Sequence, residues 1–568
     1  MVNFRLYRPA LAAPACALVA LMFSLEGVPE PLEPAVSPAT FEAGRAAATA
    51  RQIVDAAQER APGSEGDAAG ADLVARRFAE IPAGTVSEQT VSASFDGEEV
   101  ETRNVLITLP GESPVTIVVL AGRDAARGSG AASSAAATGV LTELAAALGV
   151  AGHRKTYVVA STSGAAEGAA GARQLLGALA DPSAVEAVVV ISQPGAAERS
   201  RPFVVTSSTD SGRTAIQLAR TAAEAVEVQA QEPGDDSQIF GQIARLAIPA
   251  GLGEQAPLIG AGADAVAISS AGERPLEPEA DQPEDVSVAT LGDFGRAAQS
   301  TVQAIDAADS PLEHGPSSYV EAGGNLVPGW TLALLGMALL LPAAVAAVDT
   351  LARASRRPQR LGASVLWVAG WSAPLLAGLV ALYGLALVGV IARPEFPFDP
   401  GRYEIGIAAG VAFVLCCAAV AGGGLAVRRF ERASRPARGP LVAGLGAVSV
   451  AAGLLAWLSN PYLGLLIAPA AHVWLLASGP PGRLRAVATI VAGVAALLPL
   501  LFALGHLASV LELGADAPWT FMLLLADGQI GLASAVAICL LCGSLAAVTA
   551  SAVQATIHAR DAYADPVR

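Results

Sequence analysis

The sequence predicts an α/β sandwich with a mostly parallel central sheet, followed by a C-terminal bundle of transmembrane α-helices. Hydrophobic residues make up 53% of the 568 residues and charged residues only 15%, whereas soluble chains carry about 25% charged residues. Long apolar stretches are concentrated after residue 325. Before that point, apolar runs typical of strands alternate with helical patterns. These observations divide the chain into an outer domain and a membrane domain.

The first 25 residues contain an apolar stretch, 9–25, that follows Arg5 and Arg8. A basic start before a short apolar stretch is typical of a cleaved signal peptide or of an uncleaved membrane anchor. The residues that follow are rich in proline and glutamate and offer no clean small-residue cleavage site. This favours the anchor.

Residues 26–308 are expected to form the outer domain, and 309–325 a linker. The expected strands are 88–94, 103–109, 115–121, 157–162, 186–192, 203–208 and 264–270. The expected helices are 40–60, 69–81, 134–148, 167–180, 211–227 and 288–308. The first two strands join near Asp96-Gly97. Continuous apolar strands that alternate with helices predict a largely parallel sheet with both faces covered.

Residues 326–568 are expected to form a polytopic membrane domain of seven helices, because a bilayer span needs about 20 mostly apolar residues. The expected spans are 326–348, 362–391, 404–427, 440–458, 462–479, 486–509 and 529–552. The apolar segment 518–525 is too short to span and is expected at the membrane surface.

Arginines fall in every second loop of this domain. They are Arg353, Arg356, Arg357 and Arg360, then Arg428, Arg429, Arg432, Arg435 and Arg438, then Arg483 and Arg485, and finally Arg560. The loops between them are acidic or neutral. Because basic loops stay in the cytoplasm, the pattern predicts a multi-pass protein of the cell membrane. Both termini would be cytoplasmic and residues 26–325 extracytoplasmic.

The two parts also differ in charge. Residues up to 325 carry a net −21 and those from Leu326 onward a net +5, which gives −16 in total. An acidic outer domain argues against a nucleic-acid partner. All five cysteines lie in expected spans, so no disulfide is expected to hold the outer domain.

Four segments of the outer domain together resemble the co-catalytic zinc aminopeptidases, the family that includes secreted bacterial leucyl aminopeptidases and glutamate carboxypeptidase. They are ERAPGSEGDAAGADLVARRF (59–78), RNVLITLPG (103–111), GAASSAAATGVLTELAAAL (130–148) and YVVASTSGAAEGAAGAR (157–173). The resemblance runs from about residue 43 to 308. It implies an aminopeptidase-like α/β/α sandwich.

The resemblance also implies two zinc ions held by two His, two Asp and one Glu, with a second Glu as general base. The matching positions do not supply these groups. The expected His-x-Asp is Gly122-Arg123-Asp124, the bridging Asp falls at Ser133 or Ser134, the Glu pair at Ala165 and Ala166, the next Asp near Ser192 or Gln193, and the last His near Gln255. We therefore expect no metal, no cofactor and no catalytic residue in this degenerate cleft. Asp124 is expected to brace a turn and Glu167 to lie at a helix N-terminus.

Histidines are scarce. His153 and His314 are the two of the outer domain and are expected on its surface. His472 and His506 fall within spans, where a polar residue is a functional candidate. The alternative is that each is bonded to nearby backbone or lies at the membrane interface. There is also no cysteine outside the spans and no G-x-S-x-G that would indicate a nucleophile.

The overall plan is similar to that of the large polytopic subunit of the GPI-transamidase complex, in which an aminopeptidase-like domain serves assembly and substrate presentation. By this resemblance we expect a non-catalytic membrane protein surrounded by membrane lipids. Its outer domain would act as a scaffold or binding module for a peptide, protein or lipid-linked envelope substrate. Two alternatives are a membrane-bound zinc metallopeptidase with unrecognised ligands and a lipid-handling or transport bundle.

Overall fold

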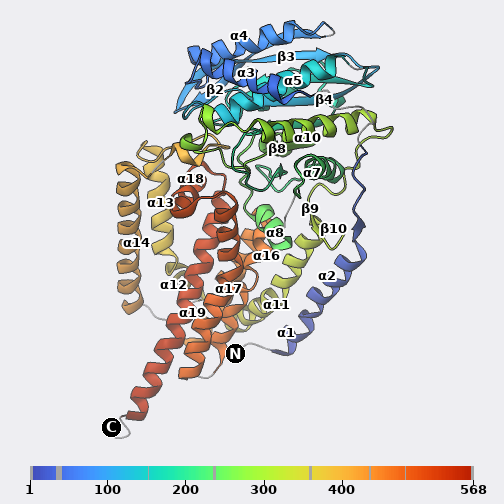
Figure 1. The fold of residues 1–568 in the computed structure, drawn as a ribbon. Coiled ribbons are helices and arrows are strands. Elements are labelled where there is room, and N and C mark those ends of the chain that lie inside the picture. Colours follow the sequence, from blue (N-terminus) through green and yellow to red (C-terminus); the bar gives the residue numbers. More distant parts are fainter. Residues whose placement is uncertain are drawn as a thin grey trace.

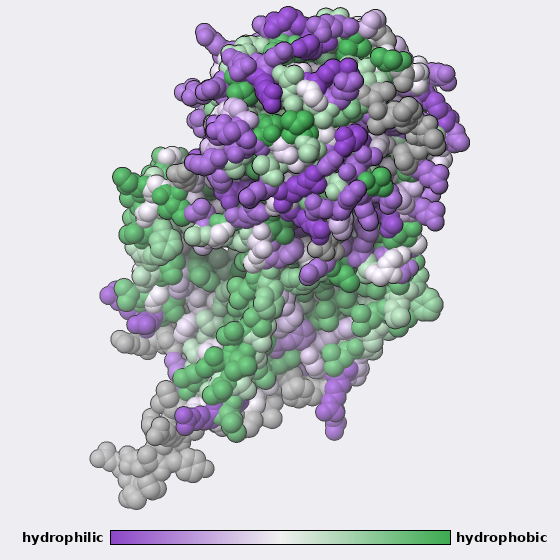
Figure 2. Space-filling view, in the orientation of Figure 1, coloured by the Kyte–Doolittle hydropathy of each residue, from purple (hydrophilic) through white to green (hydrophobic). Residues whose placement is uncertain are grey.

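The computed structural model describes residues 4–33, 41–82, 84–150, 152–233, 238–356, 361–403, 405–433, 436–479 and 482–564. An α/β domain stands on one end of a helical part (Figure 1). Hydrophilic side chains cover the α/β domain and apolar ones cover much of the helical part (Figure 2). This division agrees with the two parts predicted from composition.

The α/β domain is built on a seven-stranded sheet of order β2-β3-β5-β4-β6-β8-β7. The strands are β2 (Thr85–Phe95), β3 (Glu98–Leu109), β4 (Ser113–Gly122), β5 (Lys155–Thr162), β6 (Val185–Ser192), β7 (Val204–Val205) and β8 (Ala265–Ser269). The central strands β5, β4, β6 and β8 are parallel, whereas β2, β3 and β7 pair antiparallel. The sheet is therefore mixed rather than mostly parallel. One cause is the two-residue turn at Asp96-Gly97, where both residues have positive φ (54° and 79°), which closes a β2–β3 hairpin.

Helices cover both faces of the sheet. They are α3 (Ala43–Ala56), α4 (Glu65–Ala79), α5 (Ala136–Val150), α6 (Ala170–Ala178), α7 (Ile216–Ala230), α8 (Ile239–Ala247), α9 (Gln255–Gly260) and α10 (Val288–Ala307). Val119 of β4 belongs to the buried cluster that includes residues of α3, α4, α5, α7 and α10, whereas its neighbours Val118 and Leu120 belong to the cluster with residues of α6 and α9. This alternation of side chains along β4 produces the two buried layers of a sandwich.

A small sheet of order β1-β10-β9 joins the two parts of the molecule. Its strands are β1 (Glu26–Gly27), β9 (Tyr319–Ala322) and β10 (Asn325–Pro328). Strand β9 lies within the segment 309–325 that was expected to be a linker, so this connection is itself structured.

The helical part contains α1 (Phe4–Ala10), α2 (Ala12–Phe23), α11 (Gly329–Ser355), α12 (Leu361–Gly370), α13 (Ala373–Leu387), α14 (Ile407–Ala433), α15 (Arg438–Ser459), α16 (Pro461–Ile467), α17 (Arg483–Val510), α18 (Ala517–Asp527) and α19 (Leu532–Ala564). A 3-10 helix, Ala470–Ser478, continues from α16. The beginning of α1 and the end of α19 both lie at the far end from the α/β domain (Figure 1).

Eight helices of the described residues are long and apolar enough to span a membrane. One of them, Ala131–Val150, is buried in the α/β domain against the sheet, so its apolar character serves that core. The other seven overlap predicted spans. The remaining predicted span, 362–391, is the bent pair α12 and α13, whose axes differ by 57°. These helices indicate a multi-pass membrane protein; Arg357, Arg360 and Arg435 of the orientation argument lie outside the described residues.

Candidate functional site

The carboxyl ends of the central strands open onto a cavity of about 140 Å³, the sheet-edge cavity. It is the place where α/β sheets commonly bind ligands. Six of the seven predicted cleft positions line it: Gly122, Asp124, Ser133, Ala165, Ala166 and Gln193. The seventh, Gln255, instead donates to the carbonyl and hydroxyl oxygens of Ser207, at 3.4 and 3.3 Å. Its neighbour Glu254 lines the cavity in its place.

Asp124 is held by backbone groups. Its two carboxylate oxygens accept the N–H groups of Ala165 and Ala166, each at 3.0 Å. Burial, together with the nearby Asp67, raises the pKa of Asp124, and the two amides oppose that rise. Asp124 thus braces the turn after β5, which is the role expected for it.

Arg123 forms a buried ion pair beneath the cavity. Its Nε lies 2.8 Å from Oδ1 of Asp67, and the two side chains are 0% and 2% exposed. Oδ2 of Asp67 also accepts the hydroxyls of Thr102 and Ser163, at 2.5 and 2.8 Å. Burial lowers the pKa of the Arg123 guanidinium, and the charge of Asp67 opposes the change. The pair anchors α4 to the end of β4 and is not available to a ligand.

Glu254 was missed in the sequence. Its Oε1 accepts the hydroxyl of Thr162 at 2.7 Å, and burial raises its pKa to about 7. A Cβ placed on Gly122 would lie 3.0 Å from Oε2 of Glu254 and 2.7 Å from Cβ of Ala165. The carboxylate of Glu254 therefore occupies the space into which a side chain at position 122 would extend.

Asp281, from the acidic loop 271–287, closes another side of the cavity. Its Oδ1 accepts the N–H groups of Ala132 and Ser133, at 2.7 and 2.9 Å, and Oδ2 accepts the Ser133 hydroxyl. Burial raises the pKa of Asp281 to about 6. Nothing in the local sequence of this loop shows that one of its carboxylates is buried.

Residues 392–403, the cap loop between α13 and α14, reach from the helical part to the cavity. Asp399 lines the cavity and its carboxylate lies 2.7 Å from Nε of Arg127. The N–H of Gly168 donates to the carbonyls of Glu395 and Pro397, at 3.0 and 2.7 Å. The membrane domain therefore supplies part of the cavity wall.

Glu167 was expected at a helix N-terminus, but it does not lie at one. Gly168 and Ala169 have φ values of 72° and 47°, and α6 begins only after this left-handed stretch. The Glu167 carboxylate instead binds the cap loop: Oε2 lies 3.1 Å from Nη1 of Arg402 and accepts the Tyr403 hydroxyl at 3.0 Å. Glu167 is thus an anchor between the two domains.

The residues present do not fit a pair of zinc ions. Asp124, Glu254 and Asp281 already accept hydrogen bonds from neighbouring protein donors, and no histidine is among the described residues that line the cavity. Nor do any three His, Cys, Asp or Glu side chains of the described ranges lie close enough together to hold a metal ion.

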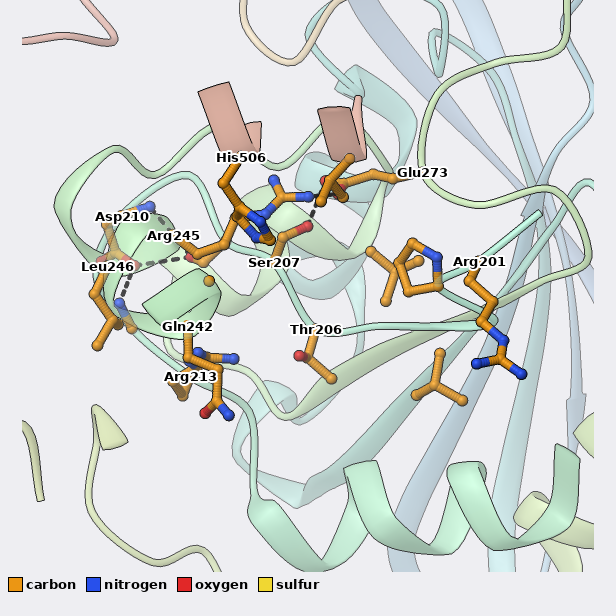
Figure 3. A pocket seen from close by; sticks show the side chains of 17 residues that line it. Arg201, Thr206, Ser207, Asp210, Arg213, Gln242, Arg245, Leu246, Glu273 and His506 are labelled. Carbon is orange, nitrogen blue, oxygen red and sulfur yellow. Dashed lines mark hydrogen bonds and ion pairs between the residues drawn. The ribbon is translucent and has the colours of Figure 1, made fainter. Parts of the chain in front are cut away.

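The histidines lie elsewhere. Nδ1 of His153 is 2.8 Å from the carbonyl of Lys155, and Nε2 of the exposed His314 is 2.7 Å from Asp264. Nδ1 of His472 is 3.0 Å from the carbonyl of Ala468, one turn earlier. This agrees with the alternative that the histidine is bonded to nearby backbone. His506 lines a second cavity of about 240 Å³, the interface pocket, between α17, α8 and the loop 201–213 (Figure 3).

Solved structures similar to this chain include a glutaminyl cyclase from an Acidobacteriales bacterium (16% identity, TM-score 0.38), which matches 48% of this chain and 97% of that one. A zinc aminopeptidase from Bacillus subtilis (13%, 0.37) matches 46% of this chain and 94% of its own. The LapA aminopeptidase of Legionella pneumophila (14%, 0.39) matches 47% and 73%. No protein-family model matches the sequence, and a search of curated proteins finds no similar one. These distant likenesses carry no activity to this chain.

Proposed function

We propose that the chain is a non-catalytic multi-pass membrane protein whose α/β domain is a scaffold or binding module for a peptide, protein or lipid-linked envelope substrate. The observation that carries this proposal is how the carboxylates of the sheet-edge cavity are hydrogen-bonded. A hydrolase of the expected class needs ligands for a metal and a free carboxylate base. Here the carboxylates of Asp124 and Glu254, which line the cavity, accept hydrogen bonds from the protein's own donors.

The cap loop supports a role in assembly. Ion pairs join it to the α/β domain at Arg127–Asp399, Arg173–Glu395 and Arg402–Glu167. Further contacts join the domains elsewhere: the amide of Gln529 donates to the carbonyls of Thr209 and Pro249, both at 2.6 Å. A substrate held by the α/β domain would therefore stand in a fixed position relative to the membrane helices.

The proposed orientation places residues 26–325 outside the cell and the C-terminus in the cytoplasm. The described Arg353 and Arg356 end α11 at the end of the helical part that lies away from the α/β domain, as do the arginines at the end of α14. In a background without the native cysteines, Glu65→Cys should react with an impermeant thiol reagent in intact cells. Ser355→Cys should react only after the membrane is opened. Equal labelling of both in intact cells contradicts the orientation.

The test of function uses the full chain purified from its native membranes. We expect a peptide, protein or lipid-linked molecule to co-purify and no hydrolysis of aminoacyl reporters. Elemental analysis of the same sample separates the zinc-peptidase alternative. Two zinc ions per chain, with peptidase activity that a chelator abolishes, would contradict the non-catalytic proposal.

A second arm of the co-purification test is Arg402→Gln, which removes the ion pair between the cap loop and Glu167. If the α/β domain presents its substrate from a fixed position, this variant should retain less of the co-purified molecule. Equal retention would show that binding of the co-purified molecule does not depend on the docking of the two domains. The transport alternative predicts instead that retention depends on residues of the spans.

A further inference from the structure

The interface pocket lies where the α/β domain meets the end of α17. His506 projects into it from α17, opposite residues of α8 and of the loop 201–213 (Figure 3). The imidazole packs directly on Gly241 of α8, since a Cβ there would lie 2.5 Å from Nε2. The pocket is therefore bounded on one side by an apolar helix and on the other by a hydrophilic domain.

Both acidic side chains of the pocket are engaged within the protein. The Glu273 carboxylate accepts the N–H of Leu252 at 2.8 Å, the Ser207 hydroxyl and the guanidinium of Arg245. Oδ1 of Asp210 accepts the N–H of Gly212 at 2.7 Å and the hydroxyl of Ser208 at 2.8 Å. The charge of Glu273 is thus compensated by Arg245, whereas Asp210 is held by neutral donors.

Arg213, in contrast to the two carboxylates, is not fully engaged by hydrogen bonds. Its guanidinium lies over the ring of Tyr319, 5.6 Å from the centroid, and its buried Nη2 has no hydrogen-bond partner among the described residues. A buried donor without a partner is costly, about 1–3 kcal/mol. Arginine binds phosphate well because its planar donors match the oxygens of that anion.

An apolar stripe leads to this pocket along α17. Val494, Leu498 and Phe502 precede His506 and Val510 at intervals of four residues, so each side chain lies next to the following one and the row winds gradually around the helix. The first three are 58%, 38% and 62% exposed. Val204, Leu246 and Val510 continue the apolar surface into the pocket. An amphiphile fits these surfaces if its anionic head lies in the pocket and its long apolar tail lies along the apolar residues of α17.

We propose that the interface pocket binds the phosphate of an anionic phospholipid, with Arg213 as its principal donor and the acyl chains along the Val494–Leu498–Phe502 stripe. The site is separate from the sheet-edge cavity and does not depend on the function proposed for it. The lipid would bind across the contact between α17 and α8 and strengthen the docking of the two domains.

The test titrates delipidated full-length protein in detergent with dioleoylphosphatidylglycerol and counts bound lipids by native mass spectrometry. We expect Arg213→Gln to weaken binding by about tenfold, the usual scale for one charge-assisted hydrogen bond. The matched control is Arg220→Gln. Arg220 lines the adjacent cavity, and its buried Nε likewise has no partner in the described part of the chain. Equal weakening by the two variants, or none by Arg213→Gln, overturns the assignment.

Gly241→Ala keeps the test decisive if Arg213→Gln does not fold. It leaves every charge in place but pushes the His506 ring into the pocket, so it should also weaken lipid binding. Unchanged binding would contradict the site. Two further ligands identify the source of the phosphate. Dioleoylphosphatidylcholine should bind more weakly than the anionic lipid, and inorganic phosphate should not displace that lipid at equal concentration. Equal binding of the zwitterionic lipid, or displacement by phosphate, overturns the anionic lipid assignment.

Discussion

The sheet-edge cavity and the interface pocket belong to one chain but differ in how they use their polar groups. In the first, Asp124, Glu254 and Asp281 all bind donors of the protein itself. In the second, the carboxylates are equally engaged, yet the buried Nη2 of Arg213 has no partner among the described residues. A cavity at the usual ligand-binding edge of a sheet can thus have its carboxylates engaged by the protein itself. What matters is whether polar groups remain available to a ligand.

The largest effect is expected beneath the sheet-edge cavity. Asp67→Ala leaves the Arg123 guanidinium buried without its counter-charge, which should lower the free energy of unfolding by about 3–5 kcal/mol. Thermal unfolding of the purified protein measures it. The control, Asp72→Ala, removes a pair with Arg103 in which the side chains are 57% and 31% exposed, and should cost at most about 1 kcal/mol. Similar losses in the two variants would mean that the buried Asp67–Arg123 pair stabilises the protein no more than the exposed pair does.

The next effect is a dependence on pH. The pKa of Glu254 is raised from 4.5 to about 7 in the folded protein, so between these values the folded state binds the proton that the unfolded state releases. The contribution of Glu254 to stability is then complete below pH 4.5 and is lost as the pH rises through 7, by up to about 3 kcal/mol. Asp281, with a pKa raised to about 6, acts in the same direction.

Glu254→Gln should therefore reduce this slope and make the protein more stable than the wild type at pH 8. Unfolding temperatures recorded from pH 5 to 8 provide the comparison. Glu80→Gln, at an exposed carboxylate, should leave the slope unchanged. A wild-type stability that rises between pH 5 and 7 would argue against a buried, protonated Glu254.

A smaller effect is expected at the cap loop. Arg402→Gln removes the ion pairs with Glu167 and with the exposed Asp96 but leaves the Tyr403 hydroxyl bonded to Glu167, so the local loss should be about 1–3 kcal/mol. Faster hydrogen exchange of residues 392–403 would report it. Arg173→Gln breaks the more exposed pair with Glu395 and should change exchange less. If both variants exchange alike, the buried anchor at Glu167 contributes little to closing the cavity.

The smallest effect is expected at His472. Its Nδ1 lies 3.0 Å from the carbonyl one turn earlier, and its ring meets the edge of Tyr7 at 6.2 Å between centroids; a hydrogen bond within a membrane helix bundle is worth about 0.6 kcal/mol. His472→Leu should therefore change the unfolding temperature little and leave phospholipid binding intact. A loss of lipid binding as large as that of Arg213→Gln would contradict the placement of the lipid in the interface pocket.

Sequence reasoning found most of the sheet-edge cavity because its residues lie at the ends of strands, where the apolar runs stop. It placed Gln255 in the cavity instead of Glu254, since one residue decides which side chain of a short loop turns inward. It also expected Glu167 at a helix N-terminus, because no sequence pattern shows that Gly168 and Ala169 adopt left-handed conformations. Asp399 carried no signal at all: its partner Arg127 is 272 positions away.

The sequence by itself determined the division into an α/β domain and a part rich in apolar helices, and the positions of most strands. These are local properties, since the periodicity of apolar residues and the identity of each side chain are visible along the chain. Only the tertiary structure decided which charges are neutralised, where the cap loop docks and that Arg213 and His506 line one pocket. Ion pairs and cavities depend on contacts between distant segments, and burial decides how strongly each polar group needs a partner.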